Sequence, residues 1–487
     1  MTPRGSQPGS GEPREDAPVR GLDPPPAAMR AILRRVVDLL VDDRATLGER
    51  RVGLRASAAD LAAVVDEPLP RGGLGAEATV DAFFERIVPH MTRVDHPRFH
   101  AYIPCPSSFQ GMLGAILAAG TNPFVGSWLG GAAVCALELT VLRWIAEAIG
   151  CARLDAGVLT SGGSLANLTA IATARRHHAD RLGGRGVLYF SAQGHLSAQK
   201  AAELLGFPPE HLRVVATDRR FRLRVHELER QLARDRAAGL VPFFVCANGG
   251  TTNTGAIDPL PELATLCRRE GLWLHVDAAY GGFAALGPTG RARLAGMPEA
   301  DSLTLDPHKW LYTPIGVGCF LTRHRASFEG AFHSGGDYLQ DVPRDEVNFF
   351  DRGPELTRPG RVLAVWALMR SVGADRLARE VEEDLRLAAM AERWLAEDPR
   401  FEIVTPVALS IVTFRHAGAG LDERERARRD RALMELTLAE GEIMLSTTEL
   451  DGRSALRLVV LNHRTSEAEV RRTVEVVRRA AERVAAG

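Results

Sequence analysis

Lys309, in the stretch LTLDPHKWLYTP (303–314), is one of only two lysines in the chain. Lysine and arginine together number 60, and the second lysine is Lys200. An arginine guanidinium stays protonated at any pH that a protein meets, whereas a lysine amine loses its proton when it is buried or lies near a positive charge. Only the neutral amine attacks a carbonyl carbon to form a Schiff base. Lys309 is therefore a candidate covalent catalyst. The alternative is that this lysine has no special role and was retained by chance in a chain whose other basic residues are almost all arginine.

Other polar residues follow short apolar runs in the same way as Lys309. The stretch TSGGSLANLTAI (160–171) joins a glycine turn to a helix that starts near Ser164, and free amide groups at a helix start bind anions. His195 and Asp277 end two further runs. Singly, these features are a generic turn, an ordinary histidine and a capping carboxylate. Together, a phosphate turn, a ring-stacking histidine, an aspartate that keeps a pyridine nitrogen protonated and a Schiff-base lysine describe a pyridoxal-phosphate site.

The apolar runs alternate with amphipathic helical patterns from about residue 156 onward. This alternation predicts an α/β fold in which helices cover both faces of a mainly parallel sheet. Ligands bind beyond the carboxyl ends of the strands in such sheets, so the polar residues should meet at one edge. Seven runs are predicted as strands: 157–160, 186–190, 212–217, 242–247, 272–277, 302–305 and 316–321.

The remaining segments indicate a tail and three structured parts. Residues 1–27 are rich in proline, glycine and charge, which predicts a disordered tail, and they contain no apolar stretch of the kind found in signal peptides. The C-terminal part combines a long helical run (362–397) with three strands (401–406, 409–415 and 455–462) and a last helix with a Ser-x-x-Glu capping box. The predicted parts are an N-terminal helical segment (28–110), a cofactor-binding large domain (111–361) and a small C-terminal α+β domain (362–487).

Composition excludes several classes of partner. Hydrophobic residues make up 45% of the chain, charged residues 25%, and the net charge is −1, so neither nucleic acid nor an anionic membrane is expected to bind. The uncharged stretch 111–137 is interrupted at 120–123 by GTNP, which predicts a buried helix, a loop and a second helix rather than a membrane span. Six scattered cysteines without a CxxC pair predict reduced thiols in a cytoplasmic protein, and no metal site is predicted.

From about residue 75 to residue 480, the chain resembles the group II pyridoxal-phosphate-dependent decarboxylases, the family of aromatic-L-amino-acid, histidine and glutamate decarboxylases. The resemblance implies an aspartate-aminotransferase-like fold (fold type I) and an obligate homodimer with active sites at the subunit interface. It is carried by HPRFHAYIP (96–104), GSW (126–128), LTSGGSLANL (159–168), HVDAAYGG (275–282), DPHKWLYTP (306–314), DYL (337–339) and LNHRT (461–465).

The resemblance also implies roles for single residues. Lys309 would form the Schiff base, Asp277 would pair with the pyridine nitrogen, and His195 would stack on the ring and help to hold the substrate carboxylate. Tyr338 matches a loop tyrosine that protonates Cα after carbon dioxide leaves. The other implied cofactor contacts are Gly163, Ser164 and Thr251 at the phosphate, Ala279 against the second ring face, and Asp306 and His308 beside the lysine. The implied substrate contacts are Tyr102, Ile103, Pro104, Cys105, Phe124 and Gly126.

Some positions depart from the animal aromatic decarboxylases. Asp306 stands where those enzymes have an asparagine that donates to the phosphate, and an ionised aspartate would repel that phosphate. Cys105 replaces a substrate-contacting threonine. Ile103 and Gly126 stand where those enzymes place phenylalanines around the substrate. The pocket wall therefore differs, and the substrate could be bulkier than dopa or unlike it.

The predicted activity is decarboxylation of an L-amino acid, with an aromatic one favoured over acidic and other aliphatic ones, to the amine and carbon dioxide. An aminotransferase of the same fold would need an arginine clamp for the retained carboxylate and would not use a loop tyrosine. Aldehyde-forming relatives change either the tyrosine or the stacking histidine, and both Tyr338 and His195 are present. A catalytically silent binding homologue would be expected to lack one of the core residues.

Overall fold

The computed structural model describes residues 22–333, 341, 345–418 and 420–486. Residues 1–21 of the predicted tail lie outside this range. Residues 26 and 27, the last two of the predicted tail, belong to the first helix, which begins at Pro26. Tyr338 also lies outside the described residues. The described residues divide into two compact units, one within residues 22–50 and 56–91 and the other within residues 51–55 and 92–486.

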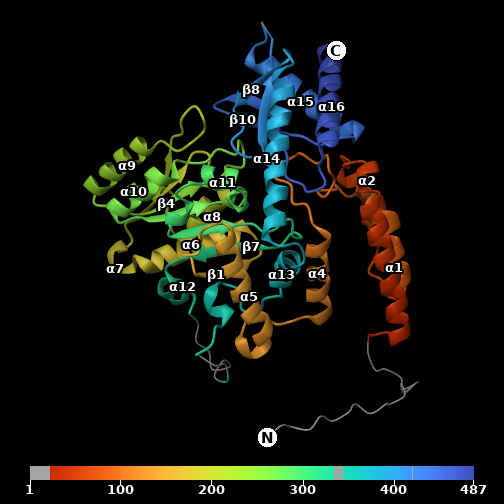
Figure 1. Cartoon of the computed structure of the whole chain (residues 1–487), viewed down its shortest axis with the longest axis horizontal. Coiled ribbons are helices and arrows are strands. Elements are labelled where there is room, and N and C mark those ends of the chain that lie inside the picture. Colours follow the sequence, from red (N-terminus) through yellow and green to blue (C-terminus); the bar gives the residue numbers. More distant parts are fainter. Residues whose placement is uncertain (1–21, 334–340, 342–344, 419, 487) are drawn as a thin grey trace. The chain divides into compact units, whose positions relative to one another are not determined.

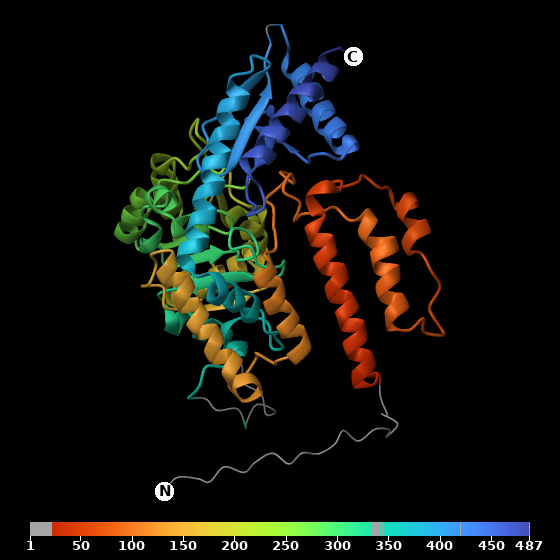
Figure 2. The same ribbon diagram turned by 45° about the vertical axis from the view of Figure 1, so that its right-hand side comes forward.

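The first unit is helical, as predicted for this part of the chain. It contains α1 (Pro26–Ala45), α2 (Ala58–Val65) and α3 (Ala76–Ala82). An ion pair of 2.6 Å between Arg35 and Asp81 joins α1 to α3, which lie side by side in Figure 2. Along α1, apolar side chains at every fourth position are exposed, namely Met29, Leu33, Val37 and Val41. This row lies on one side of α1, because residues four apart share a helix face.

The second unit is built on a seven-stranded sheet of order β1-β7-β6-β5-β4-β2-β3. Figure 1 labels β1, β7 and β4 of this sheet. The pairs within β6-β5-β4-β2-β3 are parallel, and β7 runs antiparallel to both β1 and β6. All seven predicted strands are therefore present, and the mainly parallel sheet is confirmed. The strands are β1 (Ala156–Thr160), β2 (Gly186–Ser191), β3 (Leu212–Val215), β4 (Val241–Asn248), β5 (Trp273–Asp277), β6 (Ser302–Leu305) and β7 (Gly318–Thr322).

Helices cover both faces of this sheet, as the alternating pattern predicted. In β2, Val187 and Tyr189 pack in one core cluster with residues of α9 and α10, whereas Leu188 and Phe190 pack in another with residues of α6 and α8. Successive strand side chains point to opposite faces, so β2 is buried on both sides. The helices of this part are α6 (Gly163–His177), α7 (Ala179–Leu182), α8 (Leu196–Leu204), α9 (Val225–Ala237), α10 (Leu260–Glu270), α11 (Pro288–Arg293) and α12 (Arg325–Phe332).

The apolar stretch before the sheet forms α4 (Phe109–Thr121) and α5 (Trp128–Ala148), which confirms the predicted helix, loop and helix. Only α5, among the described helices, is long and apolar enough to span a membrane. Its Cys135, Val141 and Ile145 pack in the main core, as in the core helix of a globular domain. The expectation that the first helix is buried was wrong, because α4 exposes much of its apolar surface.

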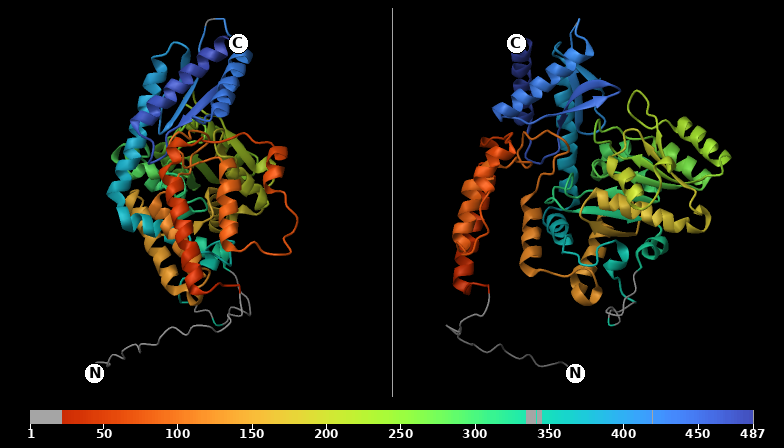
Figure 3. Two further views of the ribbon diagram at one scale, coloured as in Figure 1. Left: turned by 90° about the vertical axis from the view of Figure 1, so that its right-hand side faces the viewer. Right: turned by 180° about the vertical axis from the view of Figure 1, so that it is seen from behind.

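The C-terminal part contains a small antiparallel sheet of order β10-β11-β9-β8, visible in Figure 3. The predicted run 362–397 is two helices, because Gly373 has a φ of 76° that interrupts the helical path. Strand β10 was not predicted. The elements are α13 (Val362–Val372), α14 (Ala374–Ala396), β8 (Phe401–Thr405), β9 (Ile411–His416), α15 (Glu423–Glu440), β10 (Ser446–Leu450), β11 (Arg453–Val459) and α16 (Glu467–Ala486).

Candidate active site

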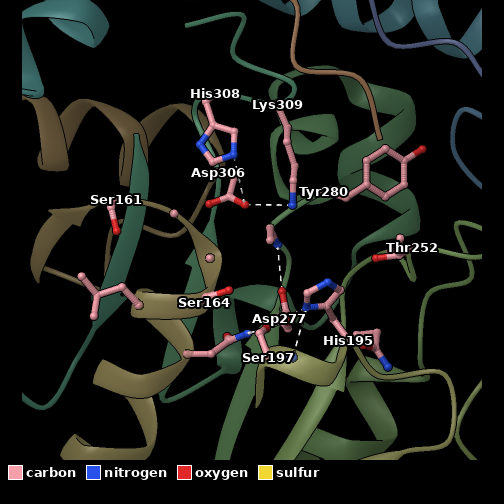
Figure 4. Close-up of a pocket in the computed structure, with 17 residues that line it drawn as sticks. Ser161, Ser164, His195, Ser197, Thr252, Asp277, Tyr280, Asp306, His308 and Lys309 are labelled. Carbon is pink, nitrogen blue, oxygen red and sulfur yellow. Dashed lines mark hydrogen bonds and ion pairs between the residues drawn. The ribbon is translucent and has the colours of Figure 1, made fainter. Parts of the chain in front are cut away.

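A cavity of about 400 Å³ lies at the carboxyl ends of β1, β2, β4, β5 and β6 (Figure 4). Each of these strands ends in a turn that carries polar residues into the cavity, as expected for an open α/β sheet. The structure therefore brings together residues that are up to about 150 positions apart in the sequence. Eight of the predicted site residues line the cavity: Gly163, Ser164, His195, Asp277, Ala279, Asp306, His308 and Lys309.

Asp277 is held in place at the end of β5 by two hydrogen bonds. Its Oδ2 accepts from Nδ2 of Asn167 over 2.8 Å, and its Oδ1 accepts from the backbone N–H of Ala279 over 3.1 Å. The carboxylate is 7% exposed, and its open side faces the cavity. An aspartate fixed in this way is suited to pair with a protonated ring nitrogen.

His195 is the N-cap residue of α8, and its tautomer follows from its partners. The backbone N–H of Ser197 donates to Nδ1 of His195 over 3.2 Å, so Nδ1 is the unprotonated nitrogen of the neutral ring. The hydroxyl of Ser197 lies 2.7 Å from the same nitrogen and accepts from Asn167 over 3.0 Å. This pattern places the N–H of a neutral His195 ring on Nε2, for which the described residues provide no hydrogen-bond acceptor.

Lys309 points into the cavity from the turn after β6, with Nζ 2.8 Å from Oδ2 of Asp306 (Figure 4). Burial acts to lower the pKa of Lys309, but Asp306 and Asp277 outweigh it, and the pKa is raised above its ordinary value. From the sequence, burial was expected to deprotonate the amine of Lys309. In the structure, the adjacent carboxylates hold the amine as an ammonium instead, and Asp306 is its ion-pair partner.

The anion-binding end of the cavity is the N-terminus of α6. Gly162 precedes the helix with a φ of 159° and no side-chain cap, so the first amide groups of α6 are open toward the cavity. A side chain at Gly163 would be crowded, because a Cβ there would lie 3.0 Å from Asp306 and 3.2 Å from Ala279. Ser161 and Ser164 add hydroxyl groups at this edge. This donor set is suited to a phosphate group.

Thr251 does not line the cavity, contrary to its predicted role at the phosphate. It is 2% exposed, and its Oγ1 lies 3.0 Å from Oγ1 of Thr254 and accepts from the N–H of Ala256 over 3.1 Å. These bonds stabilise the turn after β4 and occupy the Thr251 hydroxyl within that turn. The neighbouring Thr252 lines the cavity instead.

None of the six predicted substrate contacts lines this cavity in a single chain. The charges of Lys309 and Asp306 influence the thiol of Cys105, but burial has the larger effect and raises the pKa of Cys105 to about 11, so this thiol is neutral. Tyr102 is 63% exposed, and Ile103 packs beside the main core. The other three do not reach the cavity either: Pro104 is buried, and Phe124 packs around the glycines at Gly126 and Gly130.

Asn167 is the principal residue that the sequence reasoning missed. It lies one turn into α6, donates to Asp277 and Ser197, and accepts from Thr304 over 2.8 Å and from His275 over 3.0 Å. Burial lowers the pKa of His275 to about 4, so this histidine is neutral. Asn167 stands within the quoted motif LTSGGSLANL, and its place four residues after Gly163 was the available signal.

The residues of this cavity fit pyridoxal 5′-phosphate. An amine for the aldehyde, a fixed carboxylate for the ring nitrogen and a helix N-terminus for the phosphate surround one space. His195 and Ala279 both line that space and could contact a flat ring. Oδ1 of Asp306 is a buried oxygen without a hydrogen-bond partner in the described structure, as expected beside a site that receives a polar ligand.

Comparisons with known proteins agree with this geometry. The pyridoxal-dependent decarboxylase conserved domain matches residues 61–417. The chain is 36% identical over 460 residues to an aromatic-L-amino-acid decarboxylase of Bacillus atrophaeus, covering 94% of this chain and 96% of that protein. It is 30% identical over 457 residues to a phenylacetaldehyde synthase of Arabidopsis thaliana, covering 91% and 93%.

A crystal structure of Oryza sativa TDC with PLP and tryptamine superposes with a TM-score of 0.89 at 28% identity, covering 94% of this chain and 98% of that one. The predicted family, fold class and cofactor are thereby confirmed. The chain therefore belongs to the pyridoxal-dependent decarboxylase family and is a carboxy-lyase that uses pyridoxal 5′-phosphate.

Proposed function

We propose that this enzyme decarboxylates an aromatic L-amino acid and that Lys309 binds the cofactor covalently. The hydrogen-bonded series His195–Ser197–Asn167–Asp277, which faces Lys309 across one cavity, is the observation that carries the proposal. The similarity to an aromatic-L-amino-acid decarboxylase over nearly the whole chain supports the aromatic substrate.

The bound cofactor supplies an electron sink for the electron pair released at Cα. Asp277 keeps a proton on the ring nitrogen, and Asn167 fixes the direction in which the carboxylate points. His195 presents Nε2–H, which can donate to a substrate carboxylate and fix its orientation. Asp306 pairs with the amine of Lys309 and holds it at the edge of the cavity.

An aminotransferase is less consistent with the cavity. No arginine lines it among the residues that the structure describes. Arg457, in β11, comes near, but its guanidinium donates to the carbonyl groups of Tyr102 over 2.9 Å and of Asn253 over 3.0 Å. Arg457 therefore holds two loops together and is not available as a clamp for a carboxylate that the product retains.

An aldehyde-forming reaction is the second candidate, because the chain is also similar to a phenylacetaldehyde synthase. His195 lines the cavity, and Tyr338 is present in the sequence. The resemblance implies that aldehyde-forming relatives change one of these two residues. Decarboxylation to the amine is therefore favoured.

The test is incubation of the purified holoenzyme with the twenty amino acids, dopa and 5-hydroxytryptophan. Amines, aldehydes and keto acids are identified by mass spectrometry, and carbon dioxide and oxygen are measured in the same samples. We expect aromatic amines in equal amounts with carbon dioxide and no oxygen consumption. A keto acid without carbon dioxide would show an aminotransferase, and aldehyde with oxygen consumption would show the second candidate.

We also propose that the enzyme is a homodimer with active sites at the subunit interface. In α4, the apolar side chains of Phe109, Leu113, Ile116 and Leu117 follow helical spacing and are 39 to 51% exposed. A row of this kind is typical of an interaction surface. None of the predicted substrate contacts lines the cavity within one chain, which agrees with an active site completed by a second subunit.

Light scattering during gel filtration tests the dimer. The variant Ile116→Glu places a charge in the α4 row and should shift the enzyme toward monomers. Leu204→Glu, at a leucine of α8 that is 69% exposed and outside that row, is the control and should remain dimeric. A wild-type monomer would contradict the proposal.

A cytoplasmic location is proposed from the cysteines. All six are free thiols, and Cys105 alone is not fully buried. Disulfides form and persist in oxidising compartments, so six unpaired thiols are typical of a reducing one. Cell fractionation with an antibody against the protein checks this location.

A further inference from the structure

Asp306 occupies an unusual position for a carboxylate, because it lies at the end of the cavity that is suited to an anion. It is 2% exposed, and a Cβ on Gly163, the first residue of α6, would be 3.0 Å from its Oδ2 and 3.4 Å from its Oδ1. Its Oδ2 pairs with Nζ of Lys309, and its Oδ1 is buried without a hydrogen-bond partner in the described structure. Among the described residues, the ammonium of Lys309 is therefore the nearest positive charge to this carboxylate.

Cofactor binding would change the surroundings of both carboxylate oxygens of Asp306, the Oδ2 that pairs with Lys309 and the Oδ1 that has no partner. The phosphate group, which carries a charge of about −1.5 to −2 near pH 7, is expected at the same N-terminus of α6. The ammonium of Lys309 would then have two anions to compensate, Asp306 and the phosphate. A buried, ionised carboxylate would then face a second anion with less compensation than before. An asparagine at this position would meet no such conflict, because its amide is a neutral donor.

We propose that Asp306 and the phosphate of the cofactor share one proton, which is taken from solvent when the cofactor binds. The proton adds to Oδ1 of Asp306, and the resulting O–H donates to a phosphate oxygen. Asp306 thus acts as a neutral acid in place of an amide donor. Because binding takes up a proton, cofactor affinity falls as pH rises. This inference rests on the assignment of the cavity as the cofactor site.

The groups around Asp306 leave it as the site of this proton. His308 has its Nε2 3.8 Å from Oδ2 of Asp306, and its Nδ1 donates to the carbonyl of Val317 over 2.7 Å. Burial lowers the pKa of His308, which keeps that ring neutral. Lys309 already carries a proton, and Asp277 faces the other end of the cofactor. The thiols of Cys105 and Cys319 are neutral, because burial raises the pKa of both.

The experiment is calorimetric titration of the apoenzyme with pyridoxine 5′-phosphate, which has no aldehyde and cannot react with Lys309. Titrations at pH 8, where the free phosphate is a dianion, in buffers of different ionisation enthalpy give the number of protons taken up. We expect the wild type to take up close to one proton more than Asp306→Asn. Between pH 7 and 9, the dissociation constant of the wild type should rise about tenfold per pH unit relative to that of the variant.

Three comparisons separate the possible outcomes. His308→Gln should keep the proton uptake, and its loss in that variant but not in Asp306→Asn would assign the proton to His308 and overturn the proposal. Wild type titrated with pyridoxine, which lacks the phosphate, should take up fewer protons than with pyridoxine 5′-phosphate. This comparison does not depend on the folding of any variant. Lys309→Arg with and without Asp306→Asn repeats the test with a cation that does not titrate.

Equal proton uptake by wild type and Asp306→Asn, with normal binding of both, would overturn the shared proton while leaving the cofactor assignment intact. Failure of both pyridoxine 5′-phosphate and pyridoxal 5′-phosphate to bind would instead contradict the cofactor assignment. Circular dichroism of each variant confirms that it is folded before titration.

Discussion

The side-chain amide of Asn167 lies 2.8 Å from Oδ2 of Asp277 and joins the first turns of α6 to the end of β5. Asn167 also donates to Ser197 and accepts from Thr304 and His275, so its two donors and two lone pairs are all used. The direction of the amide is fixed by these four bonds. Asn167 therefore matters for catalysis because it positions Asp277, although Asn167 itself carries no charge.

Asn167→Ala should lower kcat by about 10- to 100-fold, since an unsatisfied buried polar group costs roughly 1–3 kcal/mol and Asp277 would lose its orientation. The check is steady-state kinetics together with the absorption spectrum of the bound cofactor, which should shift with the protonation of the ring nitrogen. Thr173→Ala, which removes a hydroxyl that donates to the backbone carbonyl of Thr169 in α6, is the control and should keep the spectrum. An unchanged spectrum in Asn167→Ala would show that Asp277 needs no such support.

Asp277→Asn should retain bound cofactor but lose decarboxylation by several orders of magnitude. A neutral amide does not keep the ring nitrogen protonated, and a neutral pyridine is a poor electron sink. Cofactor content is measured by absorbance after gel filtration, and activity by release of carbon dioxide. Activity near that of the wild type would remove Asp277 from the mechanism.

Lys309→Ala and Lys309→Arg should both abolish the yellow colour of the covalently bound cofactor, because neither side chain forms the imine. Lys200→Arg is the matched control, since Lys200 is an exposed residue of α8 and should tolerate arginine. Borohydride reduction followed by peptide mapping identifies the labelled lysine. A label on Lys200 would show that the central assignment is wrong.

Tyr338→Phe should shift the product from amine toward aldehyde, with consumption of oxygen and retention of tight substrate binding. Tyr338 lies outside the described residues, so this prediction depends on the resemblance and on the local sequence HSGGDYLQDVP (333–343). The phenylalanine keeps the ring and removes only the acid that would protonate Cα after carbon dioxide leaves. Amine formation at the normal rate would point to another proton donor, and His195 is the next candidate.

Asp384 should make the stability of the enzyme depend on pH. It accepts from Trp310 and Tyr312 over 2.8 Å each, and burial raises its pKa from 3.8 to about 7. Between these two values, the native state holds a proton that the unfolded state has released, so stability falls as pH rises from about 4 to 7. Three pKa units correspond to a loss on the order of 4 kcal/mol.

Asp384→Asn should remove most of this fall, because an amide does not ionise. The measurement is the denaturant midpoint of wild type and variant at pH 5 and pH 8. Relative to the wild type, Asp384→Asn should be more stable at pH 8 than it is at pH 5. A gap that does not depend on pH would show that Asp384 does not titrate in this range.

The pattern of apolar runs was sufficient to predict the seven strands of the large sheet. These strands are buried on both faces, which requires continuous apolar runs bounded by polar turns. Runs of this kind can be recognised from the amino-acid sequence alone. Strand β10 was missed because it is only partly buried and reads STTEL (446–450), with few apolar residues. The break at Gly373 was missed because a helical pattern continues on both sides of it, and only the backbone angle marks the end of α13.

The amino-acid sequence by itself determined which residue types could perform the chemistry, because Lys309, Asp277 and His195 each follow a predicted strand and parallel strands end at one edge of a sheet. Tertiary structure alone decided which polar atoms meet. Three features depend on distances that local sequence does not give: the contact of Asn167 with Asp277, the pairing of Asp306 with Lys309, and the presence of Thr252 instead of Thr251 in the cavity wall. Such distances follow from packing, and side-chain charge states follow from them, so neither is encoded in local sequence.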